Sequence, residues 1–555
     1  MISLFPVLWP ELILVLTASA LFLLGLSRSP RARRSAPILA AGALACVFFG
    51  ILMSSEQTGA LQDTLSGATG STFYIFQFAL YVKLIASGVG VLLVFLAWPV
   101  GEEATGNAAL EYGHDAGEFF ALMLLSIAGV FLVAGANDII LLFLGLELAS
   151  IPTYIMVSIS RPLPIAQEAG VKYFFLGAMS AALMLFGFSY LYGTTGLIKL
   201  DAIEKLFHSQ GLAGMTEWQI LAVVMLLMGL AFKIAAVPLH AYAGDVYQGA
   251  ATPVTAFLAF VPKTSGMVAI IKILYAAGGG NWSTPDILMK LLWVLAILTM
   301  SFGNMLALLQ FNVKRVLAYS SVAHSGYMLV GLTALLAARN HPAIQADALA
   351  GVLFYLAAYG VMNVGAFGVL QLLPARRSLH SVHPAPPPTA GAAETYDDLA
   401  GQGYRHIALG LAMAICCFSL TGIPFTVGFL GKYLLVQPAW AIAQVTTDHA
   451  LSSQMGWLVV ILMVNAAVSA AYYLRIIAAL FLRPAGDSAD SAAPAPTASS
   501  LLAMPPAFGV ALSVAATLLF FVYIPAANAL TSRARAAAQL QPKDAVPRNY
   551  SASAN

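Results

Sequence analysis

The sequence predicts an all-α polytopic membrane protein. Of its 555 residues, 60% are hydrophobic and only 9% are charged, and the mean hydropathy is +0.85. Soluble proteins carry about 25% charged residues. Apolar stretches of the roughly 20 residues that cross a bilayer also recur along the whole chain. These observations exclude a soluble fold, and the net charge of +2 is too small to indicate a nucleic-acid partner.

We expect about fourteen transmembrane helices, because the apolar stretches separate into about that many segments of spanning length. The first segment reads MISLFPVLWPELILVL and lacks the basic residues that open a signal peptide, so we interpret it as a retained helix. The approximate apolar cores are residues 6–26, 36–53, 74–98, 117–134, 137–158, 168–192, 219–240, 252–276, 288–310, 316–337, 348–373, 407–436, 455–482 and 501–525.

Two of these segments contain an internal proline, Pro238 in the seventh and Pro424 in the twelfth. A break in a membrane helix survives only where the freed backbone groups are packed in protein or line a wet cavity. The two prolines stand in similar surroundings, Ala-Val-Pro-Leu and Gly-Ile-Pro-Phe. Internal repeats with broken helices are typical of transporters, so we expect helices 7 and 12 to be broken.

The basic residues of the loops predict the orientation. Arg28, Arg31, Arg33 and Arg34 follow the first span, and most other loop lysines and arginines lie on the same side of the membrane. Loops rich in these residues face the cytoplasm. This pattern predicts that both termini lie outside, although basic residues in the C-terminal tail favour the opposite orientation.

Ionisable residues inside the predicted spans are the best clue to function, because charge in a bilayer is costly and usually marks an ion path. Glu147 lies in the fifth span, and Lys233, Lys263 and Lys432 lie in the seventh, eighth and twelfth. We expect Glu147 to pair with Lys233, since a buried charge needs a partner. The alternatives are a static ion pair that locks two helices, and lysines whose amines extend to the membrane surface.

Single buried charges on separate helices suit stepwise proton movement, whereas a bulky substrate would need a pocket with several polar donors. The sequence contains no CxxC, HExxH, GxGxxG or Walker pattern, and its three cysteines do not form a metal-binding pattern. We therefore expect no cofactor and no metal on this chain.

Four further ionisable residues are candidates for a supporting role. Glu168 and Lys172 are spaced i, i+4 on one helix face, and His240 and His324 could relay protons near neutral pH. An interfacial ion pair and hydrogen-bonded structural histidines are the alternatives. Three other basic residues lie nearer the ends of their spans or lack a helix break, and they are interpreted mainly as having no transport role: Lys83, Lys272 and Arg475. The alternative for Lys83 and Arg475 is binding to a neighbouring subunit or to lipid.

At these charged residues the sequence resembles a known family, the antiporter-like membrane subunits of respiratory complex I, Mrp-type cation/proton antiporters and membrane-bound hydrogenases. The resemblance covers roughly spans four to thirteen. It is carried by LFLGLELASIPTYIMV, AFKIAAVPLHAYAGDVYQGAATPVTAFLAFVPK, KRVLAYSSVAHSGYMLVG and GIPFTVGFLGKY, at residues 142–157, 231–263, 314–331 and 422–433.

The resemblance implies a division of the chain and a role for each charged residue. Glu147 and Lys233 would be the family's glutamate–lysine pair, Lys263 the connecting lysine, and Lys432 the terminal lysine, a position where another branch of the family carries glutamate. Helices 4–8 and 9–13 would be inverted half-channel repeats. The implied divisions are 1–115 with helices 1–3, 116–280 with helices 4–8, 281–483 with helices 9–13, and 484–555 with a loop, helix 14 and the tail.

Some features depart from the family pattern. Pro262 precedes Lys263, where relatives often have a small polar residue. Residues 378–395 and 484–500 are rich in proline and alanine and exceed the family's usual length. Segments of this composition cannot pack a core, so we expect flexible loops.

The function implied by the resemblance is proton translocation by a membrane subunit of an NADH–quinone oxidoreductase in the bacterial inner membrane. Its partners would be other antiporter-like subunits, small membrane subunits, lipid and, indirectly, a peripheral arm that holds flavin and iron–sulfur clusters. Quinone would be used by the complex. The alternatives are a subunit of a cation/proton antiporter without electron transfer, and a membrane scaffold that no longer pumps.

Overall fold

The protein is helical throughout the part that the computed structural model describes. The described residues are 5–27, 29, 35–54, 77–98, 116–160, 163–210, 215–339, 341–373, 393–484, 504–522 and 524–538. Within these ranges, the only β-structure consists of two isolated bridges, Asp138 with Lys199 and Asn312 with Thr395. The predicted all-α fold class is confirmed.

The described helices fall into two halves of the chain. The first half contains α1 (Phe5–Gly25), α3 (Ala36–Ser54), α5 (Gln77–Leu96), α7 (Ala116–Gly135), α8 (Ile139–Ile159), α9 (Pro164–Thr195), α10 (Leu200–Gln210), α11 (Glu217–Lys233), α12 (Ala243–Gly249), α13 (Thr252–Gly278) and the 3-10 turn η2 (Gly279–Asn281). The second half contains α14 (Asp286–Leu308), α15 (Val313–Ala337), α16 (Pro342–Leu372), α17 (Tyr396–Leu399), α18 (Gln402–Arg405), α19 (Ile407–Thr421), α20 (Val427–Val445), α21 (His449–Phe481), α22 (Met504–Val522) and α23 (Ile524–Ala538).

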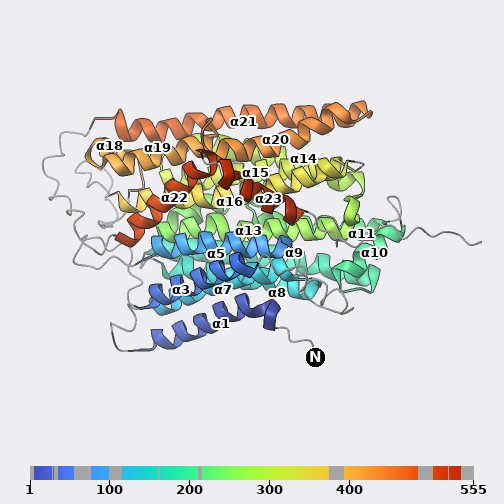
Figure 1. The fold of residues 1–555 in the computed structure, drawn as a ribbon, viewed down its shortest axis with the longest axis horizontal. Coiled ribbons are helices and arrows are strands. Elements are labelled where there is room, and N and C mark those ends of the chain that lie inside the picture. Colours follow the sequence, from blue (N-terminus) through green and yellow to red (C-terminus); the bar gives the residue numbers. More distant parts are fainter. Residues whose placement is uncertain are drawn as a thin grey trace, which may run out of the picture.

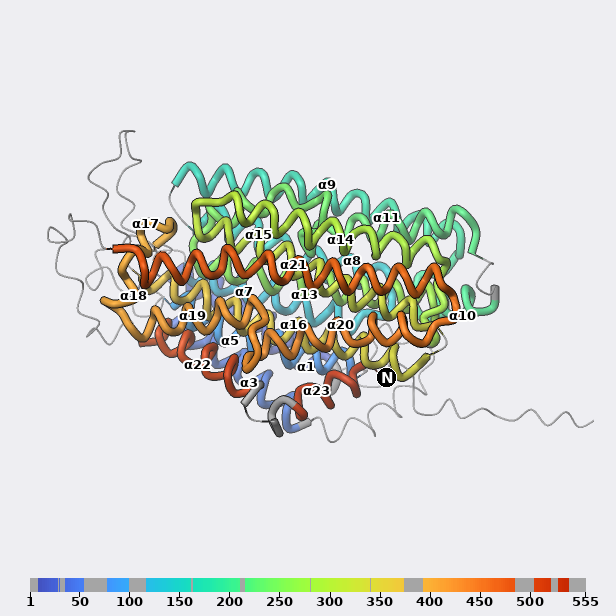
Figure 2. The backbone as a smooth tube through the Cα atoms, turned by 90° about the horizontal axis from the view of Figure 1, so that it is seen from above, coloured from blue at the N-terminus to red at the C-terminus, as the bar shows by residue number. Residues whose placement is uncertain are grey.

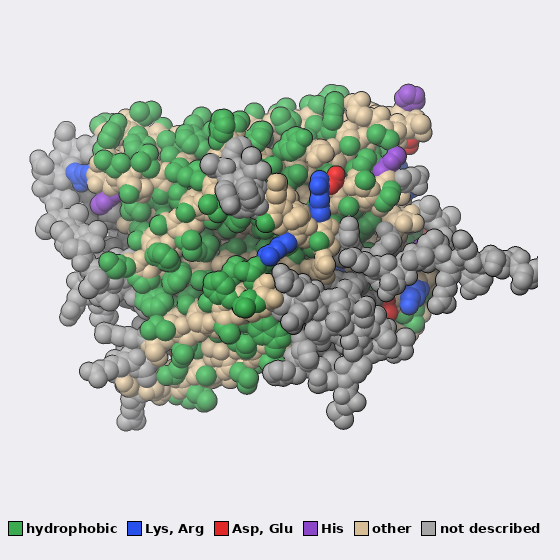
Figure 3. Space-filling view, in the orientation of Figure 1, with side chains coloured by type: hydrophobic (Ala, Val, Ile, Leu, Met, Phe, Trp, Pro, Cys, Tyr) green, Lys and Arg blue, Asp and Glu red, His purple; other side chains and the backbone are tan. Residues whose placement is uncertain are grey.

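The long helices lie side by side with nearly parallel axes, from α1 at one edge to α21 at the other (Figure 1). The view from above shows the same bundle at right angles (Figure 2). Helices α13, α15 and α16 are almost completely buried, whereas most of α1, α9 and α21 faces outward. Where Figure 3 shows described residues, hydrophobic side chains are the most frequent kind and charged side chains are few, as a lipid or subunit environment requires. The centre of the bundle is therefore the region that can hold charge away from lipid.

The helices agree in position with the segments predicted from hydropathy. Eleven helices of the described part are long and apolar enough to cross a membrane, and shorter apolar helices occupy Ile407–Thr421 and Met504–Phe520. A helix lies in each of the fourteen predicted cores. The number of helices that cross the bilayer, and the inverted relation of the two repeats, stay predictions.

The two proline-containing segments are broken, as expected. In the first, α11 ends at Lys233 and α12 begins at Ala243, so the break starts well before Pro238. In the second, α19 ends at Thr421 and α20 begins at Val427, with Pro424 between them. The first break is therefore a whole non-helical stretch and not a local bend at the proline.

The predicted loop 378–395 extends too far. Residues 374–392 and 485–500 lie outside the described residues, so most of both proline-rich segments is not tested. Ala393 N, however, donates a hydrogen bond to Leu373 O (3.0 Å), and Val313 N donates one to Glu394 O (2.7 Å). Thr395 then caps α17. Residues 393–395 are fixed because these backbone groups find partners in the helical domain.

Close helix contacts hold the charged helices in place. A Cβ atom added at Gly129 of α7 would overlap the backbone of Ala149 on α8, two residues from Glu147. Ser126 of α7 also donates a hydrogen bond to Ala149 O (2.6 Å). Glycine at position 129 thus lets α8 approach α7 and fixes the position of Glu147.

We expect Gly129→Val to destabilise the protein by about 2–3 kcal/mol or to prevent its assembly, because overpacking at a backbone contact forces two helices apart. The measurement is the apparent melting temperature of the purified membrane assembly. Gly456→Ala is the matched control, because a Cβ atom at Gly456 meets nothing within 4 Å. Equal melting temperatures of the two variants would contradict this assignment.

Candidate functional site

The expected ion pair between Glu147 and Lys233 is present. Lys233 Nζ lies 3.1 Å from Glu147 Oε1 and donates a second hydrogen bond to Ser150 Oγ at 2.7 Å. The Lys233 side chain is buried, and the Glu147 side chain is 18% exposed. Glu147 and Ser150 lie on one face of α8 because they are three residues apart.

The position of Lys233 follows from the helix break. It is the last residue of α11, where a helix carries partial negative charge on its unpaired carbonyl groups. Gly266 of α13 lies directly against the Lys233 side chain, because a Cβ atom there would be 2.8 Å from Lys233 Cβ. This contact brings α13, which carries Lys263 three residues earlier, against the break.

Lys263 is buried without a carboxylate partner among the described residues. Its amine donates hydrogen bonds to the backbone carbonyl and the hydroxyl of Ser321 on α15. It also lies 5.9 Å from the centre of the Tyr359 ring on α16. The amine is thus satisfied by neutral oxygen atoms and an aromatic face.

Helix α15 links Lys263 to the first break. Ser325 Oγ donates a hydrogen bond to Ile234 O (2.6 Å), the carbonyl that follows Lys233, and another to Ser321 O (3.2 Å). Ser321 O is also an acceptor for Lys263. One turn of α15 therefore contacts both the carbonyl that follows Lys233 and the amine of Lys263.

The same helix leads on towards Lys432 through His324. His324 Nδ1 lies 2.6 Å from the Tyr355 hydroxyl, and Nε2 lies 3.1 Å from the Tyr473 hydroxyl. The Tyr473 hydroxyl is also 2.5 Å from Ser320 Oγ. The His324 ring centre is 5.0 Å from that of Tyr359, the ring that faces Lys263. All these side chains are buried.

Lys432 is held by the second break. Its amine donates hydrogen bonds to Leu420 O (3.0 Å) and Thr421 O (2.7 Å), the last carbonyls of α19. It also lies 4.8 Å from the centre of the Tyr327 ring, three residues after His324 on α15. In an unbroken helix, partners in the next turn would occupy these carbonyls. The break thus creates the site of Lys432.

Glu147, Lys233, Lys263, His324 and Lys432 therefore form one row across the bundle, which we call the charged row. Its members come from α8, α11, α13, α15 and α20. Proton exchange is the chemistry that such a row can support, because amines, an imidazole and a carboxylate all bind protons reversibly.

Lys172 and Glu168 lie apart from the charged row. Lys172 Nζ is 2.7 Å from Glu168 Oε1 and 2.9 Å from Asp245 Oδ2, and its side chain is 43% exposed. Asp245 on α12 also accepts from Arg315 at 2.7 Å. Burial alone would raise the pKa of the Asp245 carboxyl, but hydrogen bonds from Lys172 and Arg315 outweigh it and hold the pKa below its usual value. This cluster ties α9 and α12 to the start of α15.

His240 lies inside the first break, half-buried, without a hydrogen-bonding partner for its Nδ1 atom among the described residues. No contact joins it to the charged row in the part of the chain that the structure describes. Its supporting role stays a prediction. Next to it, Pro238, Leu239 and Ala241 border an apolar cavity of about 550 Å³.

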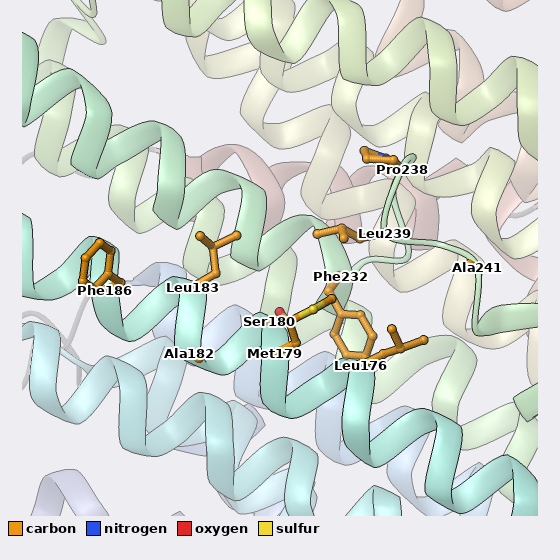
Figure 4. A pocket seen from close by; sticks show the side chains of 10 residues that line it. All are labelled: Leu176, Met179, Ser180, Ala182, Leu183, Phe186, Phe232, Pro238, Leu239 and Ala241. Atoms are coloured by element: carbon orange, nitrogen blue, oxygen red, sulfur yellow. The ribbon is translucent and has the colours of Figure 1, made fainter.

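This cavity separates α9 from the break (Figure 4). Nine of its ten lining residues are apolar, and the tenth, Ser180, already donates to Gly229 O at 2.7 Å. The cavity therefore offers no polar group that could orient a charged substrate. No group of three or more His, Cys, Asp or Glu side chains gathers anywhere in the described residues.

Several polar contacts of the row were missed in the sequence. The span 313–337 contains a repeated signal, since Ser320, Ser321, His324 and Tyr327 recur at helical spacing along one face. That pattern would have identified α15. Tyr355 and Tyr473 offered no comparable signal, because isolated tyrosines are common in apolar spans.

Lys83, which was interpreted mainly as having no transport role, has an acidic partner that was not predicted. Lys83 and its partner Glu11 are each 5% exposed, and Lys83 Nζ lies 2.5 Å from Glu11 Oε1. Glu11 in the first span was overlooked as an acid inside the membrane region. The pair is buried because α1 and α5 close around it, which hydropathy alone does not reveal.

The sequence matches a family described as "NADH:quinone oxidoreductase/Mrp antiporter, TM" over residues 136–452. That region includes every member of the charged row. The NADH-quinone oxidoreductase subunit N of Trichlorobacter lovleyi is 33% identical over 496 residues, which cover 87% of this chain and 89% of the relative.

Solved structures show the same fold. A chain of respiratory complex I from Thermus thermophilus has a TM-score of 0.67 and 27% identity, covering 93% of this chain and 98% of its own. A chain of the Mrp complex from Dietzia sp. has a TM-score of 0.71 and 19% identity, covering 96% of this chain and 97% of its own. The second likeness concerns the fold alone.

The Glu147–Lys233 pair predicts a non-additive effect on stability. We expect Lys233→Met to cost about 3 kcal/mol, near the lower end for a buried pair because Glu147 is partly exposed. The double variant Glu147→Gln/Lys233→Met should be less destabilised than Lys233→Met, since it leaves no unpaired charge. The measurement is the apparent melting temperature of the membrane assembly. Additive losses of stability in the double variant would show that the contact between Glu147 and Lys233 contributes nothing to stability.

Proposed function

Because this chain belongs to the family of NADH-quinone oxidoreductase subunit N, we propose that it moves protons across the membrane through the charged row, coupled to electron transfer from NADH to quinone elsewhere in the complex. Lysine at position 432 agrees with this branch of the family, since another branch carries glutamate there.

A series of buried hydrogen bonds and ring contacts between Lys233 and Lys432 carries this proposal. Ile234, Ser325 and Ser321 connect the first break to Lys263, and Tyr359, His324 and Tyr327 connect Lys263 to Lys432. A purely structural bundle has no need for three buried lysines with a single carboxylate, because each unpaired ammonium group opposes folding in lipid.

The contact geometry suggests the order of events. While Glu147 holds the Lys233 ammonium, the proton stays at the first break. When that contact opens, the Lys233 ammonium can pass its proton to a neutral Lys263 amine, and Lys263 to Lys432, with His324 between them. Each step transfers one proton from a nitrogen donor to a nitrogen acceptor. Lys432 releases its proton to the outside, and Lys233 is reloaded from solution on the other side. Hydration of the buried segments is needed, because the nitrogen atoms are not in direct contact.

Redox chemistry is assigned to partner subunits. Flavin and iron–sulfur clusters would lie in a peripheral arm, and the membrane partners would be other antiporter-like subunits, small membrane subunits and lipid. The proposed location is the bacterial cytoplasmic membrane, with both termini outside. These assignments rest on the family and on the loop charges, and the subunit taken alone would have no oxidoreductase activity.

Gentle purification of the assembly that contains this chain tests the proposal against the antiporter alternative. NADH-driven quinone reduction together with flavin and iron–sulfur signals in the eluate would support it. A membrane-only assembly with cation-dependent proton exchange in vesicles would favour an antiporter subunit. Intact redox activity without proton pumping would favour a scaffold.

Variants of Lys263 test the charged row directly. We expect Lys263→Met to lower the number of protons pumped per NADH oxidised by about tenfold, because the central site of proton exchange is lost. Lys263→Arg keeps the positive charge but hardly releases its proton, so it should also fail. The measurement is proton uptake into vesicles against NADH oxidation in the same sample.

Lys290→Arg is the control for the charged-row variants, because Lys290 lies exposed at the start of α14, away from the row. The variant should pump as the unmodified complex does. Normal pumping by Lys263→Arg would contradict a proton-exchanging role and leave Lys263 as a fixed positive charge.

A further inference from the structure

A second buried ion pair lies outside the charged row, among the N-terminal helices. The Lys83 amine on α5 is 2.5 Å from Glu11 Oε1 on α1, and both side chains are 6% exposed. The same amine lies 5.9 Å from the centre of the Phe131 ring on α7. Ionisable groups buried at this depth are rare in membrane proteins and usually serve a function. The mechanism proposed above makes no use of them.

A third ionisable group belongs to the same cluster. Lys272 of α13 donates a hydrogen bond to Ala136 O at 2.5 Å, one residue beyond the end of α7. Ala136 lies five residues after Phe131, whose ring faces Lys83, so both amines lie against the last turns of α7. Unlike Lys83 and Glu11, Lys272 is partly exposed. The three ionisable groups come from α1, α5 and α13, and only one of them is a carboxylate.

This ratio leaves one amine without charge compensation. If all three groups are ionised, the cluster carries one net positive charge in a largely apolar region, which is unfavourable. If Lys272 is a neutral amine, the carboxylate of Glu11 and the ammonium of Lys83 balance each other. The cluster therefore has two states that differ by a single proton on Lys272.

The end of the molecule at Lys272 offers contact with solution. Ala136, which accepts from Lys272, is followed by Asn137, whose Nδ2 atom lies 3.3 Å from Asp201 Oδ1 on α10. Asp201 is partly exposed. Lys272, itself partly exposed, is the member of the cluster that lies nearest to this end of the bundle.

The cluster is placed to act on the charged row from two directions. Lys272 lies nine residues after Lys263 on α13, about 14 Å away at 1.5 Å per residue. Charges at such a distance interact in a medium of low dielectric constant. Helix α7 separates Lys83 from the Glu147 region, since Phe131 faces Lys83 while Gly129 packs against α8. Lys272 therefore shares a helix with Lys263, and α7 lies between Lys83 and α8.

We propose that Glu11, Lys83 and Lys272 form a second proton-holding cluster, in which one proton gained or lost on Lys272 changes the free energy of protonating Lys263 on the same helix. The proton comes from solution at the Asp201 end and returns there, and no other bond forms or breaks. This inference rests on the proposed function. The charges of Glu11 and Lys83 determine the electrostatic environment of Lys272, and Lys272 exchanges the proton.

The alternative is a structural role, in which Lys272 caps the carbonyl end of α7 and the Glu11–Lys83 pair braces α1 against α5. The two roles differ in what arginine can do at position 272. Arginine keeps the positive charge and the donor for Ala136 O, so it satisfies a structural role. It hardly releases a proton, so it cannot serve a proton-exchanging one.

The experiment compares Lys272→Arg and Lys272→Met in the intact complex in vesicles, with Lys290→Arg as control. The ratio of protons pumped to NADH oxidised is measured alongside the apparent melting temperature. We expect Lys272→Arg to assemble normally but to lower the pumping ratio by about twofold or more. Glu11→Gln, which keeps a hydrogen-bond acceptor for Lys83 but removes the charge, should lower the ratio as well.

A normal pumping ratio in Lys272→Arg, with a lower melting temperature in Lys272→Met, would overturn the inference and establish the structural role. Lys263→Met in the same series separates this failure from that of the proposed function. If Lys263→Met loses pumping while Lys272→Arg does not, only the second cluster is refuted. If neither loses pumping, the proposed function fails too.

Discussion

The structure depends on lysines held at the ends of broken helices. The carbonyls at the end of a helix have no partner within the helix, and lipid supplies none. Lys432 donates to the last two carbonyls of α19, whereas Lys233 is itself the last residue of α11 and its amine binds Glu147 and Ser150. At Lys432, one contact thus solves two problems, an unsatisfied backbone and a buried amine.

Helix α15 connects the sites of the three lysines into one row. It contributes the hydroxyl that binds Lys263, the hydroxyl that binds the first break, and the ring that faces Lys432. The three lysines meet different partners: a carboxylate, a serine and two carbonyls. Charge compensation therefore changes from one lysine to the next. Such differences are needed if a proton is to move in steps, because identical sites would give it no direction.

The sequence predicted the features that depend on one helix alone, where burying polar groups away from water is unfavourable. Hydropathy located the helices, Pro238 and Pro424 located the breaks, and the shortage of acids pointed to the Glu147–Lys233 pair. Contacts that depend on how helices rotate against each other were not predictable. Tyr355, Tyr473 and Asp245 gained their roles only through packing between distant segments. The Glu11–Lys83 contact was not predictable for the same reason, since it depends on how α1 packs against α5.

The comparison of the two breaks shows why similar sequence patterns do not fix similar geometry. Lys233 precedes its proline and lies on the helix that ends, whereas Lys432 follows its proline and reaches back from α20 to the carbonyls of α19. Only the Lys432 amine binds a carbonyl end, because the Lys233 amine binds Glu147 and Ser150 of α8. What the two sites share is a lysine held at a helix end and not the order of residues. An amine that leaves its partners needs other oxygen atoms to receive it, and α15 and α16 supply buried hydroxyls along the row between the two breaks.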